Sequence, residues 1–409
     1  MKTVTVKTSE VRSSGLEVPF ADCWISEEAQ EAALTVMRSG WLTTGRENLA
    51  FETEFAAHVG AQHAVAVSSC TAGIELSLRS LNLTAGSAVL VSTMTFCGAV
   101  QAIVHAGLRP VLVDVDPATA MPDEQTTREA ARACGGAAAM LVVHWAGDPA
   151  DVPALAAAAG LDLDHVIEDA AHAIGTFTAT APVGSGSAAT CFSFYATKNL
   201  PIGEGGMVTT EDPDRADWIR RTRLHGMSAD AWRRYLPGGS WRYDVPHAGL
   251  KANMTDLQAA MGRAQLKQIA SWQARRAEIA ARYDELLGKV PGITLPHRPA
   301  PGQGTHAWHL YPIRVDLPEA GGRDQVITTL AESGIGTSVH FIPVHQLTYF
   351  RRVAVRATEA MPGADALFPR LLSLPMYPRL RDEQVDAVCE ALAASADSFV
   401  PMEDFPCQN

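Results

Sequence analysis

Short runs of β-branched and apolar residues alternate with longer alanine-rich segments from about Val18 to Ala260. The expected strands cover 63–70, 88–93, 109–116, 138–145 and 165–171, and the expected helices cover 72–81, 98–107 and 151–161. Strands that alternate with helices predict an α/β fold built on a large, doubly wound, mostly parallel sheet. In such a sheet, ligands bind at the carboxyl ends of the strands.

The rest of the chain is expected to form a smaller α/β unit. An unusually long helix is expected to begin near Thr255, its predicted N-cap, and the proline- and glycine-rich segment PGITLPHRPAPGQGT then interrupts the chain. Further expected elements are a strand over 307–316, a helix over 323–334, a strand over 336–343 and a helix over 381–395. The predicted divisions are an N-terminal tail (1–17), a large domain (18–260), a long connecting helix (261–290), a small C-terminal domain (291–398) and a tail (399–409).

The composition argues against several classes of function. The formal net charge is −12, whereas nucleic-acid-binding proteins need a basic surface, so nucleic-acid binding is not expected. The start, MKTVTVKTSEVRSSG, has no apolar core like that of a signal peptide, and polar residues interrupt the most apolar long stretch, so no membrane span is expected. The seven cysteines are scattered without CxxC pairs, so no metal site is expected and a reducing cytoplasm is predicted.

The segment GSGSAA (184–189) has the spacing of a dinucleotide-binding loop. That loop must follow a strand and open a helix, whose N-terminus then meets the pyrophosphate. In this sequence it follows TATAPV and leads into the strand-like TCFSFY. A β-turn is therefore the preferred interpretation.

Three other features suit one kind of cofactor chemistry. Lys198 follows an expected buried strand and precedes the glycine-rich turn GEGG. Asp169 ends the apolar run HVIED, where a carboxylate is partly removed from water. The segment SSCTAG (68–73) joins an expected strand to an expected helix, so its backbone N–H groups are placed to receive a phosphate.

Each feature alone has an ordinary explanation. A lysine at a strand end is more often solvated, and a loop aspartate more often caps a turn. Together, a phosphate cradle, a buried carboxylate and an isolated amine are what pyridoxal 5'-phosphate (PLP) requires. The lysine forms a Schiff base with the PLP aldehyde, and the carboxylate pairs with the pyridinium nitrogen. The combination predicts a PLP site with Lys198 and Asp169 as catalytic residues.

The sequence resembles the DegT/DnrJ/EryC1/StrS family of sugar aminotransferases, which have the type I fold of PLP-dependent transferases. The resemblance extends over nearly the whole chain, from VPFADCWISEEAQEAALTVMRSGWLTTG to LLSLPMYPRL. FSFYATKNLPIGEGGMVTT is similar to the family's Schiff-base segment, which makes Lys198 the carrier lysine. VIEDAAHAIG and GLKANMTDLQAA are similar to two further family segments.

The resemblance implies a set of residues around PLP. Asp169 pairs with the pyridine nitrogen, and His172 approaches the ring hydroxyl. The phosphate is held by Thr71, Ala72 and Ser193, Phe96 stacks on the ring, and Asn253 reaches the phosphate across the interface of a homodimer. The implied substrate contacts are Thr44, His340 and His345.

The reaction implied by the resemblance is a ping-pong transamination through the Lys198 Schiff base. L-glutamate gives its amino group to the cofactor, which then aminates a keto sugar. The expected sugar is a nucleotide-diphosphate 4-keto-6-deoxyhexose, and a 3-keto sugar or a keto-cyclitol stays open. Pathways of amino-sugar antibiotics and of surface glycans are typical of the family.

Two rival functions are a PLP-dependent dehydratase and a non-catalytic regulator of the same fold. The dehydratase branch of the family replaces the lysine with histidine, so Lys198 favours transamination. Gly73, Leu250 and Ala252 depart from the residues common in the family. These departures leave the cofactor residues in place and are expected to affect the substrate pocket.

Overall fold

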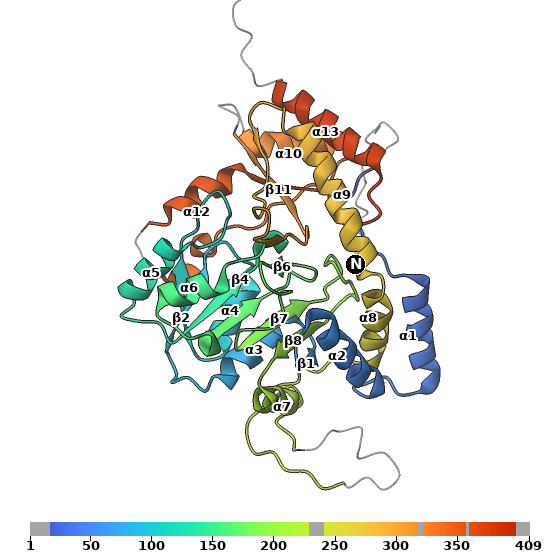
Figure 1. The fold of residues 1–409 in the computed structure, drawn as a ribbon, viewed down its shortest axis with the longest axis vertical. Helices are drawn as coiled ribbons and strands as arrows, with labels where there is room; N and C mark the ends of the chain where they lie inside the picture. The colour runs from blue at the N-terminus through green and yellow to red at the C-terminus, as the bar shows by residue number, and fades with distance from the viewer. Residues whose placement is uncertain (1–16, 229–240, 317–321, 357–359, 398–409) are drawn as a thin grey trace, which may run out of the picture.

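The computed structural model describes residues 17–228, 241–316, 322–356 and 360–397. An eight-stranded sheet lies at the centre of the fold (Figure 1). In spatial order its strands are β1 (His63–Val67), β8 (Gly206–Thr210), β7 (Ala189–Ser193), β5 (Val166–Asp169), β4 (Ala139–Val143), β2 (Ala88–Ser92), β3 (Arg109–Val113) and β12 (Val355–Arg356). Neighbours from β12 to β7 are parallel, and only β8 runs antiparallel to its neighbours β7 and β1. The predicted α/β class with a mostly parallel sheet is confirmed.

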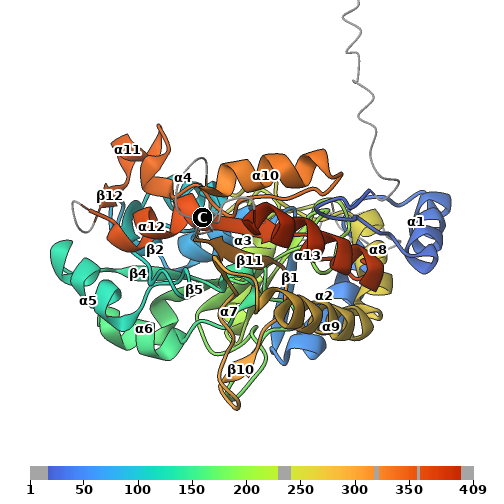
Figure 2. The same cartoon turned by 90° about the horizontal axis from the view of Figure 1, so that it is seen from above.

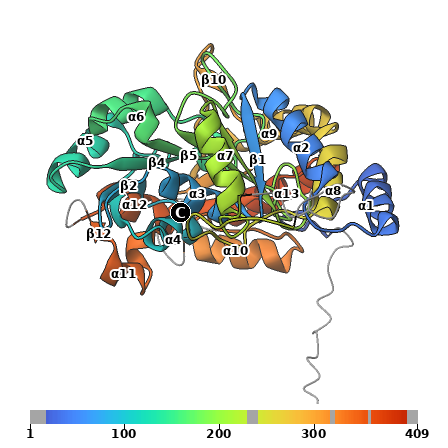
Figure 3. The same cartoon turned by 90° about the horizontal axis from the view of Figure 1, so that it is seen from below.

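Helices cover both faces of this sheet. Figures 2 and 3 show α5 (Glu124–Ala133) and α6 (Val152–Ala159) on the face opposite α3 (Cys70–Ser80) and α4 (Cys97–His105). Near the β1 edge, α2 and α7 pack against β1, and α8 packs against α1 and α2. These helices are α1 (Glu27–Ser39), α2 (Arg46–Val59), α7 (Pro213–Thr222) and α8 (Asp256–Leu266), and two 3-10 turns, η1 (Trp145–Gly147) and η2 (Leu163–His165), lie near β4 and β5 in the sequence.

Polar side chains begin several of these helices as the sequence predicts. The Asp151 carboxylate accepts a hydrogen bond from the Ala154 amide at the start of α6. Thr255 and Gln258 form a reciprocal capping box at the start of α8. Both arrangements satisfy amide groups that a helix N-terminus leaves without internal partners.

The long helix expected from Thr255 is wrong as a single element. It is divided into α8 and α9 (Ile269–Leu287), with a break at Lys267 and Gln268. Neither residue is a glycine or a proline, and both keep right-handed helical dihedrals. The two helices have different packing partners, because α8 contacts α1 and α2 whereas α9 contacts α13 (Asp382–Asp397).

A second, smaller sheet lies under α10 (Gly322–Glu332) and α13 (Figure 2). Its strands are β13 (Leu371–Leu374), β11 (Tyr311–Val315) and β9 (Ile293–Thr294), and all neighbours are antiparallel. Its apolar residues, those of α9, α10 and α13, and Val18 form a core cluster. The expected elements over 307–316, 323–334 and 381–395 are confirmed as β11, α10 and α13.

The strand expected over 336–343 is wrong. This segment has one isolated bridge, between Ser338 and Ser373, and otherwise runs without regular pairing. β13 pairs with β11 on one side, and on its free side this segment makes only the single bridge. It instead carries His340 and Phe341 to the cavity described below.

The chain between the two sheets crosses back to the large sheet. Residues 355–356 form β12, the edge strand beside β3. Nearby lie α11 (Phe350–Val353), α12 (Pro362–Leu367) and the 3-10 turns η4 (Val344–Gln346) and η5 (Phe368–Arg370). Phe350, Met361 and Leu367 belong to the core cluster of the large sheet.

Two remaining expectations concern short segments. GSGSAA (184–189) forms turns that lead directly into β7 and opens no helix, so the dinucleotide-loop interpretation is excluded. Before this segment, β6 (Phe177–Thr178) pairs with the distant β10 (Gly304–Thr305) in a two-stranded sheet. The predicted tails lie outside the described residues except for Glu17. Among the described residues, no helix has the length and apolar character needed to cross a bilayer.

Candidate active site

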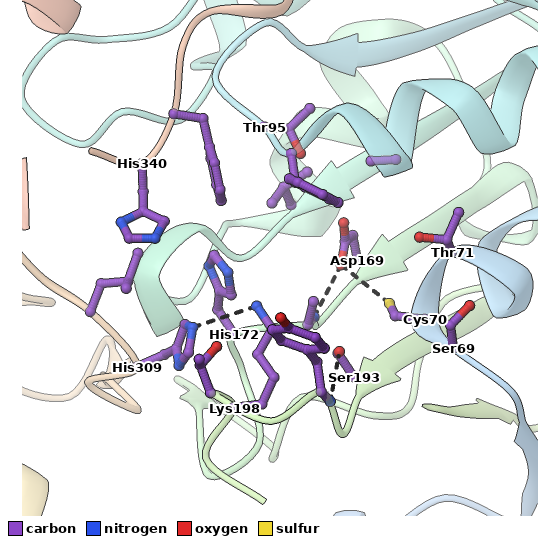
Figure 4. Close-up of a pocket in the computed structure, with 18 of the residues that line it drawn as sticks. Ser69, Cys70, Thr71, Thr95, Asp169, His172, Ser193, Lys198, His309 and His340 are labelled. Carbon is purple, nitrogen blue, oxygen red and sulfur yellow. Dashed lines mark hydrogen bonds between the residues drawn. The ribbon is translucent and has the colours of Figure 1, made fainter. Parts of the chain in front are cut away.

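A cavity of about 460 Å³ opens at the carboxyl ends of β1, β5 and β7. Its volume lies within the range of about 300–1,000 Å³ that is typical of small-molecule sites. Figure 4 shows the labelled side chains around it. The predicted site residues that line it are Thr71, Phe96, Asp169, His172, Ser193, Lys198 and His340.

Asp169 is the last residue of β5, and its side chain is only 6% exposed. Its Oδ1 accepts hydrogen bonds from the Ala171 amide (3.0 Å) and from Cys70 Sγ (3.6 Å). Oδ2 has no hydrogen-bond partner among the described residues. Burial raises the pKa of this carboxyl, while the Ala171 amide and Lys198 act in the opposite direction. The free oxygen is therefore able to accept a bond from a ligand.

Lys198 lies in the turn that leaves β7, and its amine reaches into the same cavity. Its Nζ lies 3.5 Å from Nε2 of His309. Desolvation lowers the pKa of Lys198 to about 8, against an opposing effect of the nearby Asp169 and Cys70. A substantial fraction of the amine is therefore neutral, and nucleophilic, near physiological pH.

His172 is buried beside Lys198. Its Nδ1 accepts a hydrogen bond from the Ala146 amide at 3.2 Å. Burial and the neighbouring Lys198 hold the pKa of the ring well below its usual range, so the ring is neutral. Because Nδ1 is an acceptor, the proton of the neutral ring is on Nε2. His172 therefore has one N–H group available for a ligand oxygen.

The N-terminus of α3 forms one end of the cavity. Ser69, Cys70 and Thr71 line this end, and Ser193 faces it from β7. Gly206 of β8 packs against it so closely that a Cβ atom there would lie 2.6 Å from the Ser69 carbonyl carbon. A helix N-terminus of this kind attracts anions through its free amide groups and its dipole.

Aromatic side chains form the outer wall of the cavity. Phe96 is 58% exposed, and its ring centroid lies 5.9 Å from that of Phe341. His340 stacks on Phe20 with ring centroids 5.5 Å apart, and its Nδ1 lies 3.0 Å from Ser373 Oγ. A planar ligand can therefore be enclosed between this wall and the sheet edge.

Four predicted site residues do not line this cavity. The Ala72 amide donates to Ser69 Oγ at 3.1 Å and so serves the helix cap. His345 is buried outside the cavity, where its ring contacts Thr93 and Asp365. The other two, Thr44 and Asn253, contact each other.

Thr44 and Asn253 form a separate pair. Asn253 Nδ2 donates to Thr44 Oγ1 at 2.7 Å, and the exposed Lys251 donates to Asn253 Oδ1 at 2.7 Å. Neither Thr44 nor Asn253 is among the cavity residues of the same chain.

The cavity also contains residues that sequence reasoning did not single out as site residues. Thr95, Glu204 and His309 line it. Ser69, which the strand-end rule places at the same rim within the phosphate segment, also lines the cavity and is the N-cap of α3. His309 lies in AWHLYPIRVD just before β11, where no sequence pattern distinguishes it from a core histidine.

Comparison with known proteins decides the family. The model of the DegT/DnrJ/EryC1/StrS aminotransferase family matches residues 24–393. The chain belongs to this family. SpsC of Bacillus subtilis, a spore coat polysaccharide biosynthesis protein, is 45% identical over 368 residues, which are 90% of this chain and 93% of SpsC.

Solved structures of similar aminotransferases have the same fold. The aminotransferase TlmJ from Streptoalloteichus hindustanus is 30% identical, with a TM-score of 0.83 over 94% of this chain and 100% of TlmJ. Spr1654 from Streptococcus pneumoniae is 29% identical in its PMP form, with a TM-score of 0.85 and the same coverage. A PLP form of Spr1654 is also known. The chain is accordingly a PLP-dependent sugar aminotransferase of this family.

The residues around the cavity fit this cofactor. Asp169 is a buried residue on the cavity whose Oδ2 has no hydrogen-bond partner among the described residues, which suits a protonated ring nitrogen. The N–H of His172 suits a ring hydroxyl or its anion, and the N-terminus of α3 suits a phosphate. Lys198 supplies an amine whose pKa is lowered to about 8, so that a fraction of it is neutral near physiological pH. The set thus contains one group for each polar function of PLP.

Proposed function

We propose that the enzyme transfers the amino group of L-glutamate to a nucleotide-diphosphate-linked 4-keto-6-deoxyhexose. The observation that carries this proposal is the placement of the Lys198 amine and the free Asp169 oxygen on one cavity at the carboxyl edge of the sheet. A 3-keto sugar and a keto-cyclitol are the alternative acceptors.

Bound PLP would be held by residues of the large sheet and its loops. Asp169 would pair with the ring nitrogen, His172 would donate its Nε2–H to the ring hydroxyl, and Phe96 would cover the ring. Thr71, Ala72 and Ser193 would hold the phosphate, with Ala72 sharing its amide with Ser69. When bound, PLP supplies the carbonyl carbon that receives the amino group and the ring that withdraws electrons.

Lys198 would move the protons of the reaction. As a free amine it accepts a proton from the α-carbon of glutamate at Nζ. In the second half-reaction it delivers a proton to the sugar carbon that gains the amino group. A pKa near 8 suits both directions, because neither the neutral nor the charged amine is rare near neutral pH.

The acceptor sugar would contact the outer wall of the cavity. His340 lies on this wall, so we propose it as a substrate contact. Thr44 would contact the sugar from the edge of a partner's site. His345 is the weakest of the proposed contacts, since its ring is bonded to Thr93 and Asp365 outside the cavity.

A homodimer would complete each site. The Thr44–Asn253 pair lies away from the cavity of its own chain and presents Asn253 beside the cationic Lys251. That pairing of an amide and a cation suits the phosphate of a neighbouring subunit. The dimer can be tested by mixing inactive Lys198→Ala and Asn253→Ala proteins. Recovery of activity on subunit exchange supports shared sites, and its absence in verified heterodimers contradicts them.

We place the reaction in amino-sugar biosynthesis in the cytoplasm. The 45% identity to a spore coat polysaccharide biosynthesis protein favours a surface polysaccharide over an antibiotic. Nucleotide-linked sugars are the donors for such polymers, which supports a nucleotide on the acceptor.

The test combines a spectrum with a substrate panel. The protein is loaded with PLP, L-glutamate is added, and conversion to the pyridoxamine form is followed by absorbance together with release of 2-oxoglutarate. Loss of the PLP band with glutamate, and its return with a 4-keto sugar nucleotide, supports the proposal. An unchanged band rejects glutamate as donor, and return only with a 3-keto sugar or keto-cyclitol rejects the proposed acceptor.

A further inference from the structure

A chain of hydrogen bonds leads from a backbone carbonyl to the amine of Lys198. Asn199 Nδ2 donates to the Ala307 carbonyl oxygen at 3.0 Å, and Gln273 Nε2 donates to the same oxygen at 2.7 Å. Asn199 Oδ1 lies 3.0 Å from His309 Nδ1. Nε2 on the far side of the same ring lies 3.5 Å from Lys198 Nζ.

The Ala307 carbonyl, at one end of this series of hydrogen bonds, determines the tautomer of His309. A carbonyl oxygen can only accept, so the Asn199 amide must turn its NH₂ group toward Ala307 and its oxygen toward His309. His309 Nδ1 therefore carries the proton and donates it to Asn199. In a neutral ring this leaves a lone pair on Nε2, directed at the Lys198 amine.

The groups around His309 keep its ring neutral. His309 is 6% exposed, and its ring lies against that of His172 with centroids 4.3 Å apart and the ring planes tilted by 35°. The buried guanidinium of Arg276 donates to the carbonyl oxygens of Trp308 and His309. Burial, together with His172, Lys198, Arg276 and His340, holds the pKa of His309 well below its usual range. A protonated imidazole, which could not accept from Lys198, is thereby disfavoured.

We propose that His309 is a catalytic residue whose Nε2 accepts a hydrogen bond from the Lys198 amine whenever that amine is free. Asn199 is the positioning residue that fixes the tautomer of His309. This inference rests on the proposed role of Lys198. Holding the free amine at one place keeps it beside the carbons between which it moves protons. The 3.5 Å separation is long for a hydrogen bond, as is common at catalytic groups before a ligand is bound.

The test measures the Lys198 amine directly in full-length protein freed of cofactor, without glutamate or sugar. The rate of Lys198 acetylation is measured against pH by mass spectrometry of its peptide, in wild type, His309→Phe and His309→Gln. Phe keeps a ring against His172 but has no acceptor, whereas Gln has an acceptor oxygen. An acceptor stabilises the charged amine, so His309→Phe should lower the pH midpoint by about one unit.

Three comparisons complete the test. His309→Gln should lie nearer the wild-type midpoint than His309→Phe does, and Asn199→Leu should shift the midpoint downward. His306→Phe is the matched control, because His306 is a buried histidine that stacks on Trp308, and it should leave the midpoint unchanged. A wild-type midpoint in His309→Phe, or an equal shift in His306→Phe, would overturn the proposal.

A second measurement needs no variant. In a crystal structure of the wild-type apoprotein, Nζ of Lys198 should lie within hydrogen-bond distance of His309 Nε2, and a separation beyond 4 Å would overturn the proposal. Neither measurement uses an amino donor or acceptor. If the proposed amino donor or keto sugar proves wrong, the predicted shift in the acetylation midpoint still stands. If the midpoint does not shift, the proposed substrates still stand.

Discussion

The rings of His172 and His309 lie against each other at a tilt of 35° with centroids 4.3 Å apart, yet hydrogen bonds at Nδ1 give the two rings opposite tautomers. Nδ1 of His172 accepts from the Ala146 amide, whereas Nδ1 of His309 faces the Asn199 oxygen. One ring consequently has an N–H at Nε2 and the other has a lone pair. Two adjacent neutral histidines thus provide a donor and an acceptor in one cavity.

Replacing Lys198 should abolish catalysis without loss of the fold. Lys198→Ala removes the amine that carries the cofactor and moves protons, so turnover with glutamate and a keto sugar should fall below detection. Circular dichroism should remain that of the wild type. Lys267→Ala, at an exposed lysine in the break between α8 and α9, is the control and should keep full activity. Measurable turnover by Lys198→Ala contradicts the mechanism.

Asp169→Asn should weaken cofactor binding by about 100-fold or more. The substitution removes the charge that faces a protonated ring nitrogen, and breaking a buried ion pair costs about 3–5 kcal/mol. The dissociation constant of PLP can be measured by fluorescence quenching. Unchanged affinity in Asp169→Asn means that this carboxylate does not bind the ring.

The neighbouring Glu168→Gln is the matched control for that experiment. Glu168 is equally buried, but its carboxylate accepts from His144 Nε2 at 2.7 Å and from Thr190 Oγ1. Loss of the charged partner should lower the free energy of unfolding by about 1–3 kcal/mol and leave PLP affinity unchanged. Asp169→Asn should therefore lower PLP affinity, whereas Glu168→Gln should lower only the free energy of unfolding.

The reactivity of the Lys198 amine should rise with pH, with a midpoint near 8 in the cofactor-free protein. Burial lowers its pKa to about 8 from an ordinary value near 10.5. Between these values the unfolded chain binds more protons than the folded chain, so this group's contribution to stability increases from pH 8 to 10.5 and levels off below pH 8. Denaturation of wild type and Lys198→Met across this range measures the difference. A midpoint at the ordinary value contradicts desolvation of the amine.

Gly206→Ala should destabilise the protein by about 1–3 kcal/mol and weaken PLP binding. The added methyl would lie 2.6 Å from the Ser69 carbonyl carbon and 2.7 Å from the Cys70 amide nitrogen, so the N-terminus of α3 must shift. Met207→Leu on the same strand conserves volume in a fully buried position and should cost less than about 1.5 kcal/mol. Urea denaturation and PLP titration of both variants make the comparison.

Thr255→Ala should cost about 1 kcal/mol of stability with unchanged activity. Thr255 Oγ1 accepts from the Gln258 amide, and this cap is lost in the variant. Thr53→Ala is the control, because Thr53 is exposed within α2 and should change stability by less than about 0.5 kcal/mol. Equal effects of the two variants would argue against the cap.

The large sheet was predictable because its signals are local. β-branched runs define the strands, and Asp151 and Thr255 cap helices through contacts three residues away. The break at Lys267 and Gln268 was not predictable, since both residues keep helical dihedrals. The two helices differ in the elements on which they pack. The error over 336–343 has a similar cause. Its residues suit a strand, but only Ser338 bridges to β13 in the structure, so the outcome depends on contacts outside the segment.

The candidate site was predictable where one segment carries the chemistry. Asp169 ends a strand, Lys198 and SSCTAG come after strands, and the sheet brings the carboxyl ends of these strands to one edge. The role inferred for His309 depends on Asn199, Gln273 and Ala307, which are far apart along the chain. No spacing rule connects these residues, because their contacts exist only after the two sheets have packed.

The walls of the cavity differ in their origin. Asp169, Ser193 and the start of α3 are fixed at the ends of strands in the large sheet, whereas Phe20, Phe341 and Met376 come from irregular segments outside it. Mutations in those segments can alter the outer wall without displacing the strand ends. Evolution can therefore change which sugar is accepted while the amino-transfer chemistry is inherited intact.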